Sequence, residues 1–101
     1  MRKNPAATLM VYCPTCGNSV NEYNWTLETG AIYSLKGEDS PTFIKILLEC
    51  SEGKLDQWIN FKVGCPRCHE KIRVKLIPIP DKETLMAYVD EVGEEYVNER
   101  F

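Results

Sequence analysis

The chain has 101 residues, of which 44% are hydrophobic and 27% are charged, and its formal net charge is −3. This composition fits one globular domain over residues 1–101 and excludes a disordered or fibrous chain. A chain of this length buries a smaller fraction of its surface than a larger domain, so an added cross-link or metal ion would stabilise it. No stretch approaches the ~20 consecutive apolar residues of a transmembrane helix, and we expect no membrane partner.

The first residues do not resemble a secretory signal, because the apolar run at 6–12 is short and soon interrupted. We therefore expect a cytoplasmic, reducing location. Closely spaced cysteines in such a compartment favour a metal ion over disulfide bonds. The chain contains five cysteines, a number that suits four metal ligands and one further thiol.

Taken in chain order, residues 7–77 predict a mainly β fold (small α+β), an antiparallel sheet of about five to six short strands. Aromatic and β-branched residues and the alternation of apolar with polar residues support these strands. The strongest pattern is at 42–50, where Ile44, Ile46, Leu48 and Cys50 alternate with other residues. The expected strands span residues 7–12, 20–28, 31–36, 42–50, 58–63 and 71–77.

One acidic amphipathic helix is expected at about 81–100. Pro78 and Pro80 end the last strand, and Asp81 is a suitable N-cap. Residues 81–101 carry a net charge of −5. An apolar stripe recurs at helical spacing, at Leu85, Val89, Val92 and Tyr96. This stripe either packs on the chain's own sheet or docks on a protein partner or a second copy of the chain.

Two short cysteine motifs contain the clearest chemistry. Residues 13–17 are Cys-Pro-Thr-Cys-Gly, and residues 65–69 are Cys-Pro-Arg-Cys-His, with 48 residues between Cys16 and Cys65. Two residues between cysteines allow a tight turn to present both thiolates to one tetrahedral ion. The position after each pair often needs a positive φ angle, which glycine adopts freely and histidine adopts more often than most residues. Two such pairs predict a closed, all-thiolate structural site.

These motifs and their flanking strands, over about 9–18 and 59–76, resemble the zinc-ribbon fold group. The resemblance implies a zinc-finger type site in which one Zn²⁺ per chain is bound by Cys13, Cys16, Cys65 and Cys68. The interval between the pairs is longer than in compact zinc ribbons, which implies an inserted hairpin and strand. Rubredoxins also bind iron through paired cysteine motifs, so zinc and iron remain alternatives.

Positive charge gathers around the second motif. Residues 62–75 carry a net charge of +4. We consider Arg67, Lys71, Arg73 and Lys75 as candidate nucleic-acid contacts, because the last three share one outward face of the predicted strand. The alternative is that these cations offset the −2 charge of a zinc ion with four thiolate ligands.

Other reactive or aromatic residues have structural interpretations. We expect Cys50, Trp25 and Trp58 to pack in the core, rather than to act as a reactive thiol or as platforms for base stacking. We expect His69 to occupy the turn after Cys68, rather than to act as a ligand or a base.

The sequence contains no recognisable set of catalytic residues, so neither an enzyme nor a small-molecule substrate is expected. The first functional hypothesis is a non-enzymatic, structural-zinc interaction module that binds a protein partner in transcription or another nucleic-acid machine. The second is direct nucleic-acid binding through Lys71, Arg73 and Lys75. The third is rubredoxin-like electron transfer with iron.

Overall fold

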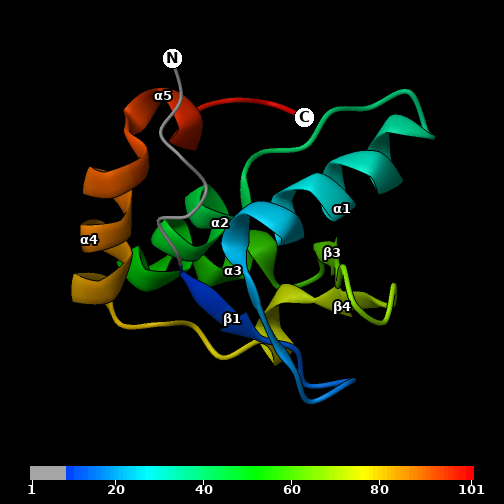
Figure 1. Ribbon diagram of the computed structural model, residues 1–101, viewed down its shortest axis with the longest axis horizontal. Coiled ribbons are helices and arrows are strands. Elements are labelled where there is room, and N and C mark those ends of the chain that lie inside the picture. The colour runs from blue at the N-terminus through cyan, green and yellow to red at the C-terminus, as the bar shows by residue number, and fades with distance from the viewer. Residues whose placement is uncertain (1–8) are drawn as a thin grey trace.

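Helices dominate the fold, and the expectation of a mainly β protein was wrong. The computed structural model describes residues 9–101 and is a small α+β structure, 51% helical, with two separate β-hairpins (Figure 1). In chain order the elements are β1 (Met10–Tyr12), β2 (Ser19–Asn21), α1 (Glu22–Ser34), α2 (Phe43–Glu49), the π-helical turn η1 (Cys50–Lys54), α3 (Leu55–Trp58), β3 (Lys62–Gly64), β4 (Lys71–Arg73), the 3-10 turn η2 (Val74–Leu76), α4 (Lys82–Val92) and α5 (Glu94–Val97).

The strands form two two-stranded antiparallel sheets instead of one sheet of five to six strands. Strand β1 pairs with β2 around Val11 and Val20, and β3 pairs with β4 around Val63 and Ile72. The strand expected at 7–12 contains β1, and its first two residues lie outside the described residues. The strands expected at 58–63 and 71–77 are reduced to three residues each in β3 and β4.

Helix α1 replaces the two strands expected at 20–28 and 31–36. The side chain of Asn21 caps it by accepting a hydrogen bond from the Asn24 backbone N–H at 2.9 Å. Gly30 lies inside this helix, where an added Cβ would meet the Cβ of Phe101 at 2.7 Å. Burial follows helical spacing, at Glu22, Trp25, Thr26, Thr29 and Gly30. Burial at this spacing outweighs the strand preference of the aromatic and β-branched residues.

Helix α2 replaces the strand expected at 42–50. Thr42 caps it and accepts a hydrogen bond from the Lys45 backbone N–H at 3.3 Å. The buried residues are the neighbouring pairs Phe43–Ile44 and Ile46–Leu47, which lie on one side of a helix and on both sides of a strand. Cys50 is therefore the first residue of η1 and not the last residue of a strand. Its side chain is half-buried against the core.

Helix α4 starts where the sequence pattern places it. The Asp81 side chain accepts a hydrogen bond from the Thr84 backbone N–H at 3.0 Å. The helix ends at Gly93, whose φ is 86°, and the short helix α5 follows. Within residues 9–101 no helix is both long and apolar enough to cross a membrane.

A buried carboxylate joins the helices. Glu22 is fully buried, and its Oε2 accepts hydrogen bonds from the Thr26 hydroxyl at 2.8 Å and the Ile44 backbone N–H at 2.7 Å. Its Oε1 accepts hydrogen bonds from the hydroxyls of Tyr88 at 2.8 Å and Tyr96 at 2.7 Å. These donors belong to α1, α2, α4 and α5, so one carboxylate links the four helices.

Candidate metal centre

The two cysteine motifs form the same turn at the tips of the two hairpins. In the first hairpin, the Cys13 N–H donates to the Asn18 carbonyl at 2.8 Å, and the Gly17 N–H donates to the Cys13 carbonyl at 2.9 Å. In the second hairpin, the equivalent bonds run from Cys65 to the carbonyl of Glu70 at 3.1 Å and from His69 to the carbonyl of Cys65 at 2.8 Å.

The position after each pair has the positive φ that the sequence predicts. The φ angles are 76° at Gly17 and 62° at His69, which is the only non-glycine residue with a positive φ within residues 9–101. Gly17 and His69 therefore adopt the same left-handed backbone conformation, each after the second cysteine of its pair.

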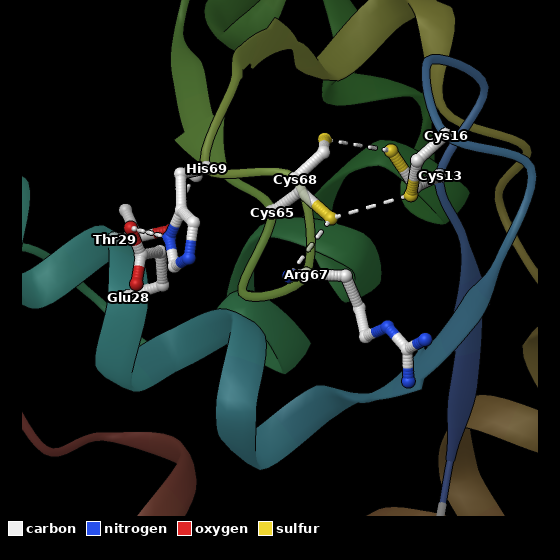
Figure 2. Close-up of polar contacts among 9 residues, drawn as sticks. Cys13, Cys16, Glu28, Thr29, Cys65, Arg67, Cys68 and His69 are labelled. Atoms are coloured by element: carbon white, nitrogen blue, oxygen red, sulfur yellow. Dashed lines mark hydrogen bonds and ion pairs between the residues drawn. The ribbon is translucent and has the colours of Figure 1, made fainter.

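The four sulfur atoms gather in one cluster, as Figure 2 shows, in which a single metal ion could contact all four. The Sγ atoms of Cys13 and Cys68 are 3.9 Å apart, as are those of Cys16 and Cys65, and all four lie within 4.8 Å of one another. A tetrahedron with ~2.3 Å from its centre to each sulfur has edges of about 3.8 Å. Each close pair joins one cysteine from each hairpin, so an ion at the centre would cross-link the two hairpins.

The environments of the four thiols differ in a regular way. The first cysteine of each pair, Cys13 and Cys65, is buried, and the second, Cys16 and Cys68, is partly exposed. Burial raises the pKa of Cys13 to about 12, whereas hydrogen bonds from the backbone and side chain of Asn18 lower the pKa of Cys16 to about 6. Four neighbouring sulfur atoms suit a cation that bonds to the thiolate forms and carries positive charge into the site.

Helix α1 holds the second hairpin in place. The Gly64 N–H donates to the Thr29 hydroxyl at 3.0 Å, and the Tyr33 hydroxyl donates to the Lys62 carbonyl at 2.9 Å. The contact is close, because a Cβ on Gly64 would lie 2.5 Å from the Ile32 Cδ1 atom.

Helix α1 also reaches the turn that contains Cys65 and Cys68. His69 Nδ1 lies 3.3 Å from the Glu28 carboxylate, and Figure 2 shows this pair beside the cysteines and turned away from the sulfur atoms. Sequence reasoning missed Glu28, Thr29 and Tyr33, because it assigned their segment to a hairpin rather than to a helix.

The candidate nucleic-acid residues are all exposed, but they do not form the set that the sequence suggested. Lys71 and Arg73 share one face of β4, and Arg67 lies in the loop with its side chain pointing away from the sulfur atoms in Figure 2. Lys75 lies beyond the strand, in η2. Lys62 was missed, and the strand register places it directly opposite Arg73.

The apolar stripe of the C-terminal helix lies inside the molecule. The side chains of Leu85, Val89, Val92 and Tyr96 are 0–9% exposed. A partner role for this stripe stays a prediction, and it would require these side chains to leave the core. Of the two tryptophans, Trp25 is fully buried and Trp58 is partly buried against the core.

No family model matches the sequence, and neither a curated protein nor a solved structure was found to match it. The assignment of a metal site rests on the geometry of the four sulfur atoms. Helices, and not the inserted hairpin and strand expected from the sequence, occupy the interval between the two cysteine turns.

Proposed function

We propose that the chain is a non-enzymatic interaction module whose fold is held by one structural zinc ion. The observation that carries the proposal is the cluster of four thiols contributed equally by two hairpins that are far apart in sequence. Zinc prefers tetrahedral thiolate sites, and a site with four protein ligands leaves no open position for a substrate. The ion therefore supplies cross-linking and stability, and it supplies no reaction.

The position of the site supports a structural role. The first hairpin leads directly into α1, and α1 contacts the second hairpin through Thr29 and Tyr33. An ion bound between the hairpins would link them directly, so that the first hairpin, the second hairpin and α1 would each be joined to the other two. A domain organised in this way presents fixed outer surfaces, and binding of a macromolecular partner is the function that such surfaces serve.

Iron is the alternative ion, since it also binds four thiolates. The test is to purify the chain from cells and measure its bound metals by elemental analysis together with its visible absorption. We expect one zinc per chain and no colour. A red protein with one iron per chain would replace this proposal with electron transfer.

Chelation provides the second arm of the test. We expect a strong zinc chelator to unfold the reduced chain, as followed by circular dichroism, and added zinc to restore it. A reduced, metal-free chain that keeps the folded spectrum would contradict the structural role of the ion.

A further inference from the structure

The outer face of the β3–β4 hairpin concentrates positive charge. The antiparallel register places Lys62 directly opposite Arg73 and places Lys71 opposite Gly64. Val63 and Ile72, between them, are buried. Because side chains alternate between the two faces of a strand, Lys62, Lys71 and Arg73 share the other face, and all three are exposed. We call these three residues the cationic face.

The cationic face is not neutralised by the rest of the described chain. Within residues 9–101, no ion pair or side-chain hydrogen bond involves the side chains of its three members. Glu28, which borders Gly64 from α1, lies 3.3 Å from His69 Nδ1 and forms no ion pair with any of the three cations. Glu70 is the only acidic residue in the segment 62–75, which keeps a net charge of +4.

The positions of these cations destabilise the β3–β4 hairpin. Like charges directly opposite each other on paired strands are destabilising, and Lys62 and Arg73 are such a pair. Compensation of the metal site does not explain them, because they lie at the ends of β3 and β4 that are remote from the cysteine loop. Residues that destabilise the fold and make no stabilising contact in return are typical of a binding surface.

We infer that the cationic face binds the phosphate backbone of a nucleic acid. The inference rests on the proposed function, because only the metal-supported hairpin presents the three side chains together. A phosphate between Lys62 and Arg73 would replace their repulsion with attraction. Contacts of this kind fix a nucleic acid in place and carry no sequence information.

An acidic protein is the competing partner, and the composition of the face disfavours it. Protein interfaces are usually centred on buried aromatic or apolar anchors. The remaining position on this face is Gly64, which has no side chain and is covered by α1. The exposed side chains that the hairpin itself places on this face are all cations, which suits phosphate better than protein.

The test uses the full zinc-loaded chain and fluorescence anisotropy with labelled RNA, single-stranded DNA and duplex DNA at several salt concentrations. We expect binding with weak sequence preference to at least one of the three, with affinity falling as salt rises. The double variant Lys62→Gln/Arg73→Gln should weaken binding and reduce the slope of log affinity against log salt by about 2, roughly one for each phosphate contact. The variant Lys54→Gln/Lys82→Gln, which removes the same charge from η1 and α4, should bind as the parent does.

The inference is overturned if the two double variants lose affinity equally, since overall charge would then explain binding. It is also overturned if poly-glutamate competes as well as RNA, which would assign the face to an acidic protein. Zinc content and circular dichroism separate the two proposals. A folded zinc protein that binds none of the three nucleic acids refutes this inference alone, whereas a chain that folds without metal refutes the proposed function.

Discussion

At the scale of single residues, the mutual proximity of their sulfur atoms separates the four clustered cysteines from Cys50. We expect Cys65→Ser to lose the metal and leave the chain unfolded or aggregated. Structural zinc contributes ~10–16 kcal/mol in small peptides, which is comparable to the ~5–15 kcal/mol stability of a whole domain. Zinc content and circular dichroism measure the result.

Cys50→Ala is the matched control. Cys50 is half-buried outside the cluster, and burial together with the neighbouring Glu49 carboxylate raises the pKa of its thiol, so it stays protonated near neutral pH. The variant should keep one zinc per chain with a modest loss of stability. Loss of zinc from Cys50→Ala, or its retention by Cys65→Ser, would show that the ligand set is wrong.

Glu22 provides a second residue-level prediction. Tyr88→Phe removes one of the four donors to a fully buried carboxylate. Hydrogen bonds to charged groups contribute about 1.5–3 kcal/mol, so the free energy of unfolding should fall by about that amount. Urea denaturation measures the change, and Tyr12→Phe, at an exposed tyrosine on β1, should change it by less than ~0.5 kcal/mol.

The pH dependence of the stability of Tyr88→Phe tests whether the lost hydrogen bond to Glu22 causes this decrease. Burial and the Glu22 carboxylate raise the pKa of Tyr88 above its ordinary value. Because the folded state holds this proton more tightly than the unfolded state, the contribution is complete below the ordinary tyrosine pKa of about 10 and is lost as pH rises above it. The difference between parent and Tyr88→Phe should therefore shrink at alkaline pH. Parallel pH profiles would argue against the assignment.

At the scale of elements, the β3–β4 hairpin should gain stability from a change that impairs binding. Lys62→Glu turns a repulsive cross-strand pair with Arg73 into an attractive one. Such pairs contribute about 0.2–1 kcal/mol, so we expect a small rise in melting temperature together with weaker binding of nucleic acid. The control Lys54→Glu makes the same charge change outside the hairpin. Unchanged or lower stability of Lys62→Glu, relative to this control, would contradict the argument about repulsion.

The C-terminal helices behave as part of the core in this structure. Truncation after Pro80 removes the hydroxyls of Tyr88 and Tyr96 from Glu22 and removes the buried side chain of Leu85. We expect the truncated chain to unfold, as measured by circular dichroism in the presence of zinc. If it stays folded and loses only a partner, the sequence hypothesis that α4 and α5 form a docking site is correct.

Local features made some elements predictable from the sequence. The spacing of each cysteine pair, together with Gly17 and His69, depends on a turn of six residues and needs no knowledge of the rest of the fold. Helix α4 was found because Asp81 caps it and its apolar residues recur at helical spacing. Both features depend on residues close together in the chain.

Helices α1 and α2 were missed because the composition of their segments favours strands. The prediction used the aromatic and β-branched residues of these segments and did not consider Asn21 and Thr42, which cap the two helices. The role of Glu22 was beyond sequence reasoning, since Tyr88 and Tyr96 lie 66 and 74 residues away along the chain. Lys62 was missed because its place opposite Arg73 depends on the register of β3 and β4.

At the scale of the whole molecule, opposite charges lie on different sides. In Figure 1 α4 and α5 lie at the left of the view and the β3–β4 hairpin lies at the right, below α1, with α2 near the centre. Residues 81–101 carry a net charge of −5, and residues 62–75 carry +4. Lys62, Lys71 and Arg73 are accordingly exposed, with the acidic helices on the other side of the view.

Helix α1 connects the metal centre to the helical core. It contacts the first hairpin through the Trp25 indole N–H, which donates to the Val11 carbonyl at 3.3 Å, and it contacts the second through Thr29. It also contains Glu22, which fixes α2, α4 and α5. Loss of the ion should thus loosen the helices as well as the hairpins.

X-ray absorption at the zinc edge of the purified chain tests the central claim most directly. We expect four sulfur atoms at ~2.3 Å from the zinc ion and no nitrogen or oxygen ligand. A shell that contains a nitrogen or oxygen ligand, or a folded reduced chain with no zinc to measure, would contradict it.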